Sequence, residues 1–366
     1  MKTFDSFCKS VLAALLCVCA LQAASAAAPL YRQTATVPLG KPDRWDYVHF
    51  DPTLQQVFVA HDSEITVVST DQHPHIVGQV RGIAGAHGIA TEPTLGVGYA
   101  DNGKTGRLSV FDLKTLRVID SIPTDADSDA VAYLAPTHTV LVANGDGHSL
   151  SLIDAVARRR IANVALGGSP EGVVAIMPGY AFVNLADRRQ VVRVDLLHHL
   201  VDTRWPVAEC VSPHGLAMDP ANQRLFVSCK NGVLMVLSAR NGRIVATVPI
   251  GMGTDTAVFD PKRHLIFSSN ADGTLSVIDQ HTANSYGLLA SVPTALGART
   301  MAEDPESGRV FLVTAEPAQT PDGKAQSRQD HPRFKPGTVR MFMLAPAHGL
   351  ETATHPGPGT AHAISN

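Results

Sequence analysis

Residues 213–237 read PHGLAMDPANQRLFVSCKNGVLMVL, a stretch in which short apolar segments alternate with turn signals. Asp219-Pro220 predicts a turn, because proline presets φ and aspartate can bond the backbone that follows it. Asn231-Gly232 is a pair typical of a tight hairpin. Together with the residues that follow, the stretch predicts four short strands, at 215–218, 225–227, 233–237 and 244–250.

The same unit recurs along the chain, and its clearest marker is a proline, often preceded by aspartate, after each first apolar segment. The intervals between these prolines are 41, 43, 42, 42, 41 and 44 residues, a regularity that indicates a structural repeat. The prolines are Pro52, Pro93, Pro136, Pro178, Pro220, Pro261 and Pro305.

Four short strands in about 42 residues, repeated without helical periodicity, are typical of a propeller blade. Seven repeats therefore predict an all-β fold, a seven-bladed β-propeller of four-stranded blades. Residues 35–40, ATVPLG, nearly match the fourth strand at 246–251, ATVPIG. The last unit has only three candidate strands, so we expect the N-terminal strand to complete that blade and close the ring. The three candidates are residues 300–303, 310–313 and 338–344.

This repeat unit resembles that of the YVTN-type (YncE-like) β-propeller repeat proteins. The resemblance rests on three segments: Pro213-His214-Gly215-Leu216-Ala217 before Asp219-Pro220, Phe267-Ser268-Ser269-Asn270, and Ser276-Val277-Ile278-Asp279. It covers about residues 35–344 and implies the propeller fold. It implies no catalytic residue, because the motifs of this diverse family are mainly structural. Cys229 stands where the motif usually has asparagine, and units three and four depart from it most.

The N-terminus has the features of a secretory signal peptide. Lys2 and Lys9 precede an apolar run at 11–21, and the small residues Ala24-Ser25-Ala26 follow it, which predicts cleavage near Ala26. That run is too short to span a bilayer comfortably, and no later stretch is long and apolar enough to do so. We expect an exported periplasmic protein with a signal peptide at 1–26, the propeller at 27–345, and a flexible C-terminal tail at 346–366.

The composition excludes two classes of protein. Of the 366 residues 45% are apolar and 17% charged, which is more apolar and less charged than a disordered chain. The 30 basic and 33 acidic side chains give a formal charge of -3, whereas a nucleic-acid binder of this size is usually basic. We therefore expect no nucleic-acid partner, and a monomer that binds a protein or a small polar ligand.

Propellers bind ligands at the mouth of the central channel, where loops lead into the innermost strands. The residue at the start of each first strand is polar or charged in all seven units, so we predict that the mouth is lined by Asp46, His87, Asp129, Glu171, His214, Asp255 and Arg299. His87 and His214 share a His-Gly-apolar-Ala motif and are the candidate metal ligands, because imidazole beside carboxylate suits a divalent transition metal. A water-filled channel that merely tolerates polar residues would give the same pattern.

No H-E-x-x-H, C-x-x-C or G-x-S-x-G motif is present, so the sequence favours binding over catalysis. We predict a periplasmic binding or scaffold protein whose ligand or partner sits at the channel mouth, with a divalent metal as the one candidate cofactor. The alternative is a metal-dependent hydrolase or lyase that uses the same residues, with a histidine as base. A third hypothesis is an envelope protein that binds partners through its outer blade faces.

Two further features carry predictions. Cys210 lies in the loop before a first strand and Cys229 ends the adjacent second strand, so both are expected at one end of the same blade. Three states fit: a disulfide in an oxidising compartment, two buried thiols, or a Cys-Cys-His metal site with His214. A polar insertion at 316–337 interrupts the last unit, and it is expected to be a lid or partner contact over the mouth, or else a solvated loop.

Overall fold

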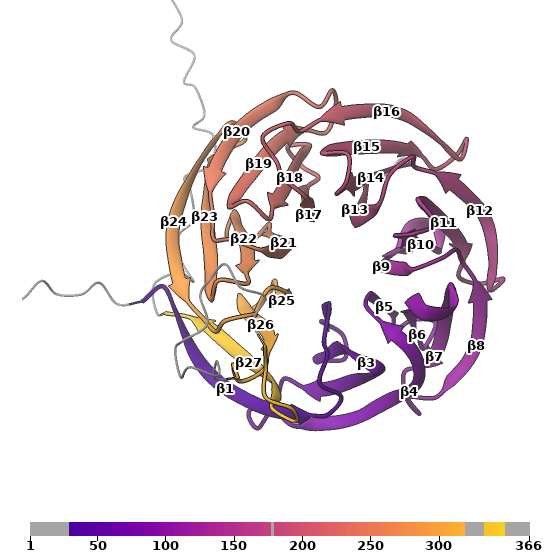
Figure 1. The fold of residues 1–366 in the computed structure, drawn as a ribbon, viewed down its shortest axis with the longest axis vertical. Coiled ribbons are helices and arrows are strands. Elements are labelled where there is room, and N and C mark those ends of the chain that lie inside the picture. The colour runs from indigo at the N-terminus through magenta and orange to yellow at the C-terminus, as the bar shows by residue number, and fades with distance from the viewer. Residues whose placement is uncertain (1–28, 177–178, 319–332, 348–366) are drawn as a thin grey trace, which may run out of the picture.

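A computed structural model describes residues 29–176, 179–318 and 333–347. Seven antiparallel sheets stand radially around a central channel, and Figure 1 shows the closed ring that they form. The predicted seven-bladed β-propeller is therefore confirmed. The predicted signal peptide, residues 319–332 of the insertion and the tail from residue 348 lie outside the described residues.

Each blade runs from an innermost first strand to an outer fourth strand. Blade one contains β2 (Val48–Asp51), β3 (Gln56–Ser69) and β4 (Ile76–Ala86). Blade two contains β5 (Ile89–Glu92), β6 (Val97–Asn102), β7 (Arg107–Asp112) and β8 (Val118–Pro123). Blade three contains β9 (Ser128–Leu134), β10 (Thr139–Asn144), β11 (Ser149–Asp154) and β12 (Arg159–Ala165).

Blades four to seven repeat this order. Blade four contains β13 (Pro170–Ile176), β14 (Tyr180–Leu185), β15 (Gln190–Asp195) and β16 (Leu200–Pro206). Blade five contains β17 (Pro213–Asp219), β18 (Arg224–Cys229), β19 (Val233–Ser238) and β20 (Ile244–Pro249). Blade six contains β21 (Thr254–Asp260), β22 (Leu265–Asn270), β23 (Thr274–Thr282) and β24 (Ser285–Pro293). Blade seven contains β25 (Met301–Asp304), β26 (Arg309–Thr314), β27 (Val339–Pro346) and β1 (Tyr31–Gly40).

Helix is confined, in the described residues, to the 3-10 turns η1 (Gly103–Thr105) and η2 (Ala135–Thr137). Neither is long and apolar enough to cross a membrane.

Blade one has three labelled strands because β3 fills two places. Its first half pairs with β2, and its second half pairs with β4. The backbone N–H of Thr70 donates to the carbonyl of Gln55 at 3.0 Å, which places the two ends of β3 side by side. The strand therefore folds back on itself and supplies the second and third members of a four-stranded blade.

The ring closes through the two ends of the chain. The strand order of blade seven is β1-β27-β26-β25, with Thr36 opposite Phe342, and Figure 1 shows the indigo β1 beside the yellow β27. The predicted closure by an N-terminal fourth strand is confirmed. Because β1 covers the outer edge of β27, the last blade is completed by the segment farthest from it in sequence.

The core lies in the seams between blades. Six blades place an aromatic residue on the second strand, and each of these side chains is at most 1% exposed: Phe58, Tyr99, Phe182, Phe226, Phe267 and Phe311. Two of them stack on an aromatic ring across a seam: Phe311 on Phe50, with ring centroids 5.1 Å apart, and Tyr99 on Tyr133, with ring centroids 6.1 Å apart. Burying one such side chain contributes about 1.5–3 kcal/mol, so apolar packing between neighbours holds the blades in the ring.

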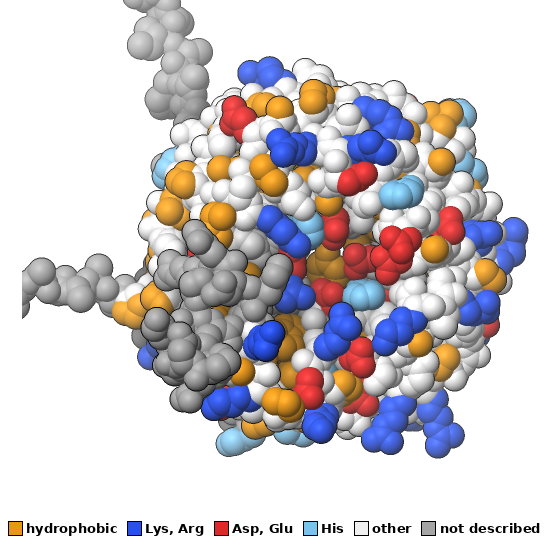
Figure 2. All heavy atoms as spheres, in the orientation of Figure 1, with side chains coloured by type: hydrophobic (Ala, Val, Ile, Leu, Met, Phe, Trp, Pro, Cys, Tyr) orange, Lys and Arg blue, Asp and Glu red, His pale blue; other side chains and the backbone are white. Residues whose placement is uncertain are grey.

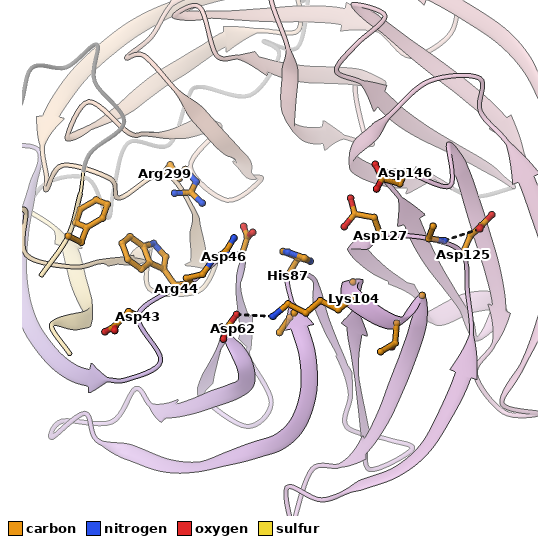
Figure 3. Close-up of a pocket in the computed structure, with 18 residues that line it drawn as sticks. Asp43, Arg44, Asp46, Asp62, His87, Lys104, Asp125, Asp127, Asp146 and Arg299 are labelled. Atoms are coloured by element: carbon orange, nitrogen blue, oxygen red, sulfur yellow. Dashed lines mark hydrogen bonds and ion pairs between the residues drawn. The ribbon is translucent and has the colours of Figure 1, made fainter. Parts of the chain in front are cut away.

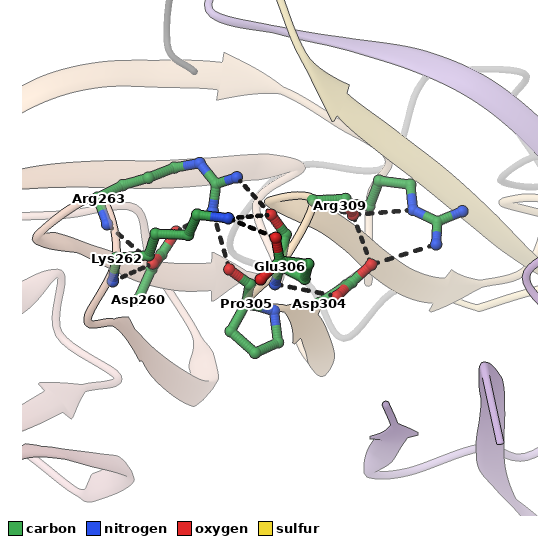
Figure 4. Close-up of polar contacts among 8 residues, drawn as sticks. Asp260, Lys262, Arg263, Asp304, Pro305, Glu306 and Arg309 are labelled. Carbon is green, nitrogen blue, oxygen red and sulfur yellow. Dashed lines mark hydrogen bonds and ion pairs between the residues drawn. The ribbon is translucent and has the colours of Figure 1, made fainter. Parts of the chain in front are cut away.

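The repeated Asp-Pro pairs end the first strands and tie neighbouring blades together. The Asp260 carboxylate accepts hydrogen bonds from the backbone N–H groups of Lys262 at 2.8 Å and Arg263 at 3.0 Å, which closes the turn. The Arg263 guanidinium donates to the same carboxylate at 2.8 Å and to the carbonyls of Pro305 and Glu306 in blade seven, at 3.2 and 3.0 Å (Figure 4). The Asp-Pro turn after β21 therefore also bridges blades six and seven.

Candidate functional site

The channel opens on one face into a cavity of about 950 Å³ among the loops that lead into the first strands. Figure 2 shows this opening as a hollow surrounded by acidic, basic and histidine side chains. Trp45 and Phe334 form an aromatic part of its wall, with ring centroids 5.0 Å apart. Deeper in the channel, a narrower cavity of about 320 Å³ is lined by first strands from all seven blades.

The predicted mouth residues lie around these two cavities. Three line the larger cavity: Asp46, His87 and Arg299. Asp255 lines the narrower one. The other three, Asp129, Glu171 and His214, interact electrostatically with members of this group. Four of the seven predicted residues therefore line one of the two cavities, and the assignment of all seven as ligand-binding residues stays a prediction.

A glycine follows three of these residues, and it allows neighbouring first strands to approach closely. A Cβ on Gly172 would lie 2.5 Å from the carbonyl oxygen of His214 in the next blade. A Cβ on Gly88 would lie 2.5 Å from the backbone nitrogen of Val131 in the next blade. Only glycine fits such contacts without a shift, so the X-Gly repeat brings each polar residue close to the next blade.

His87 is oriented by Asp101, a residue on β6 that the sequence did not single out. The carboxylate accepts hydrogen bonds from the backbone N–H groups of His87 and Gly88 at 2.6 and 2.7 Å, and its second oxygen lies 3.1 Å from His87 Nδ1. Burial opposes charge on the ring, but Asp101, Asp129 and Asp46 raise the pKa of His87 to about 10. Nδ1 is occupied by Asp101, so a protonated imidazole offers its Nε2–H to the cavity (Figure 3).

Glu171 and His214 form a second pair across the seam between blades four and five. Glu171 Oε1 lies 3.2 Å from His214 Nε2, and His214 Nδ1 lies 3.1 Å from the carbonyl oxygen of Ser212. Burial raises the pKa of Glu171 to about 7, and burial together with Lys230 lowers the pKa of His214 to about 4. One hydrogen-bonding arrangement fits both the distances and the directions of the pKa shifts: neutral His214 donates from Nδ1 to the carbonyl of Ser212, and protonated Glu171 donates to His214 Nε2.

Arg299 and Asp255 form an ion pair between blades seven and six, and Lys230 Nζ lies 3.4 Å from the other oxygen of Asp255. Burial opposes charge on Arg299, but Asp255 and Asp46 raise the pKa of its guanidinium, which stays charged. The base of the mouth thus holds one carboxylate between two cations.

Asp46 and Asp129 supply two further carboxyls to this group. Burial raises the pKa of Asp46, while Arg299 and His87 oppose that rise. Burial also raises the pKa of Asp129 well above its usual value, and the carboxylates of Asp46 and Glu171 raise it further. Several carboxyls share one poorly solvated space, so a bound cationic group would change their protonation.

Seven charged residues on the cavity wall were not singled out from the sequence: Asp43, Arg44, Asp62, Lys104, Asp125, Asp127 and Asp146. They lie outside the starts of the first strands, the positions from which the mouth residues were predicted. The acidic run at 125–129, DADSD, was a signal that could have been followed. The described ends of the insertion also reach this wall, because Phe334 lines the cavity and pairs with Pro317.

Two predictions concern metal and cysteine chemistry. Among the described residues, no group of three or more His, Cys, Asp or Glu side chains is placed to hold a metal ion, and the assignment of His87 and His214 as metal ligands stays a prediction. Cys210 and Cys229 are joined by a disulfide with Cα atoms 5.2 Å apart. Cys229 pairs with Pro213 in the sheet, which explains why the loop before β17 brings Cys210 to it.

No family model and no curated protein matches this chain. Among solved structures, the chain is similar to hydrazine synthase from Kuenenia stuttgartiensis, with a TM-score of 0.65 and 15% sequence identity. The match covers 73% of this chain and 91% of that chain. At such low identity the similarity shows the propeller fold alone, because unrelated functions are built on one fold.

Proposed function

We propose that this chain is an exported periplasmic β-propeller of the YVTN type that binds a small polar ligand in the cavity at its channel mouth. The observation that carries the proposal is the cavity of about 950 Å³, which is walled by charged side chains from several blades. Its volume is within the range of sites that enclose a small molecule, about 300–1,000 Å³. The predicted signal peptide and the disulfide support an oxidising compartment.

Binding is favoured over the hydrolase or lyase alternative by the state of the two histidines. A general base must accept a proton near neutral pH. His87 is held protonated by Asp101, and His214 is buried with both ring nitrogens engaged by Ser212 and Glu171. Neither imidazole is therefore placed to take up a proton from a substrate.

The binding proposal can be tested by blocking the cavity. Ala126 is an exposed alanine on the cavity wall, and Ala221 is an exposed alanine in the turn after β17. We expect small polar metabolites that raise the melting temperature of the wild type to lose that effect in Ala126→Trp and to keep it in Ala221→Trp. Equal shifts in all three proteins, or no shift with any metabolite, would contradict binding at the mouth.

Export is tested separately. Expressed from its full-length gene, the protein should be recovered from a periplasmic extract with its N-terminus at residue 27. An intact N-terminus in the cell interior would refute the assignment.

A further inference from the structure

The charges on the cavity wall fall into two groups, those with a partner in the protein and those without. Lys104 Nζ lies 3.5 Å from Asp62, and Arg299 pairs with Asp255. His87 is paired with Asp101. By contrast, within residues 29–176, 179–318 and 333–347, no ion pair or side-chain hydrogen bond engages the charged groups of three exposed residues on this wall: Arg44, Asp127 and Asp146.

The two unpaired carboxylates lie together on one side of the cavity. Asp127 precedes β9, and Asp146 lies in the turn between β10 and β11. The backbone N–H of Gly145 donates to the carbonyl of Asp127 at 2.6 Å, so the two loops are joined. The nearby carboxylate of Asp125 accepts from Ser149 and Asn163 at 2.9 and 2.8 Å, which keeps its charge at this edge. These loops form an anionic pole.

The opposite side of the cavity carries Arg44 and Arg299 together with three carboxyls, none of which is a free anion. Asp62 pairs with Lys104, Asp43 accepts a hydrogen bond from the backbone N–H of Gly337, and burial raises the pKa of Asp46. Arg44 and Arg299 lie across the opening from Asp127 and Asp146, with His87 between the two sides (Figure 3). Trp45 is on the cavity wall next to Arg44 in sequence. It is 8% exposed, and its indole N–H is buried with no acceptor among the described residues. That N–H is enclosed by the protein, so what this side offers a ligand is the guanidinium groups of Arg44 and Arg299, which suit an anionic group.

We propose that the ligand of this cavity is a zwitterion, with its ammonium group against Asp127 and Asp146 and its carboxylate against Arg44 and Arg299. This inference rests on the proposed function and specifies its ligand class. A dianion would place one negative end against the acidic loops, and a dication would place one positive end against Arg44, Arg299 and protonated His87. A like charge facing either pole would weaken binding. Only a molecule that carries both charges avoids this at both poles.

The test compares probes of equal length that differ only in their terminal charges. The five-carbon set is 5-aminopentanoate, pentanedioate and pentane-1,5-diamine, and the eight-carbon set is 8-aminooctanoate, octanedioate and octane-1,8-diamine. Titration calorimetry with the wild type should show that the zwitterion of at least one length binds about tenfold or more tightly than the matched dianion and diamine, as expected for a charge-assisted contact at each end.

Charge-neutral variants then locate the poles. The double variant Asp127→Asn with Asp146→Asn should weaken zwitterion binding by about tenfold and strengthen binding of the dianion, and Arg44→Gln should weaken zwitterion binding and strengthen binding of the diamine. The control is Asp71→Asn, which changes an exposed carboxylate that does not line the cavity and should leave all affinities unchanged.

The outcomes separate the two proposals. A dianion or diamine that binds as tightly as its matched zwitterion overturns the zwitterion class. The zwitterion class is also overturned if none of the six probes binds, while other metabolites bind the wild type and fail to bind Ala126→Trp. The mouth is then a site for a different class of ligand. If no compound of any class binds, the proposed function fails as well.

Discussion

The substitution Glu303→Gln is predicted to stabilise the protein at alkaline pH. Glu303 lies on β25, is 8% exposed, and its Oε1 atom has no hydrogen-bond partner among the described residues. Glu303 is the residue before the Asp-Pro pair of blade seven, and the corresponding residues of blades five and six are apolar: Met218 and Phe259. Burial, and then the negative charge of Asp260, raise the pKa of Glu303 to about 8.

The sign of the effect follows from proton binding. The ordinary pKa of a glutamate is 4.5, so between pH 4.5 and about 8 the folded protein holds a proton that the unfolded chain has lost. The free energy of unfolding therefore falls as the pH rises through this window. At about 1.4 kcal/mol for each pH unit, the full difference reaches about 5 kcal/mol. We expect about 2–4 kcal/mol, because the surroundings of an ionised carboxylate rearrange.

The assay is urea unfolding of the wild type, Glu303→Gln and a control, Glu306→Gln, at about pH 5, 6.5 and 8.5. Glu306 is three residues away, and its side chain is 86% exposed. All other carboxyls are common to the three proteins, so the differences isolate the substituted residue. Glu303→Gln should match the wild type at the lowest pH and exceed it by about 2–4 kcal/mol at the highest, while the control follows the wild type. A difference between Glu303→Gln and the wild type that is the same at all three pH values would refute the buried, protonated glutamate.

Three further predictions concern how the ring is held together. Replacing both Cys210 and Cys229 by alanine should lower the free energy of unfolding by about 3 kcal/mol, because the disulfide closes a loop with a sequence separation of 19; a denaturation midpoint unchanged from the oxidised wild type would contradict this. Gly215→Ala should lower the free energy of unfolding by about 1–3 kcal/mol in chemical denaturation, because its Cβ would lie 2.5 Å from the nitrogen of Ala257 in the next blade. The control is Gly287→Ala, whose Cβ would meet only the end of a histidine side chain at 3.2 Å. An equal loss of stability in both variants would count against close strand packing. Deleting residues up to Gly40 removes β1 and exposes the edge of β27. The truncated protein should lose its cooperative thermal transition and regain it when a peptide of residues 31–40 is added. An unaltered transition without the peptide would show that β1 does not close the ring.

Much of the fold could be predicted from the sequence because a propeller is specified by local chemistry that recurs. Asp219-Pro220 and Asn231-Gly232 set turns through their own backbone preferences, whatever surrounds them. The match of 35–40 to 246–251 identified a fourth strand without its blade, and this was enough to predict the closure seen between β1 and β27. The starts of the first strands were also predictable, because a regular repeat places equivalent residues at equivalent points around the channel.

The sequence by itself determined the number of blades, the strand order and the polar character of the mouth. Only the tertiary structure decided which of those polar groups meet: Glu171 with His214 across one seam, Arg299 with Asp255 across another, and His87 with Asp101 inside a single blade. It also decided that Arg44 and Asp127 face the same cavity from opposite sides. The physical reason is the range of the interactions. Turns and strands are set by residues that are neighbours in the chain, whereas charge pairing depends on distances of a few ångströms between loops that whole blades separate in the sequence.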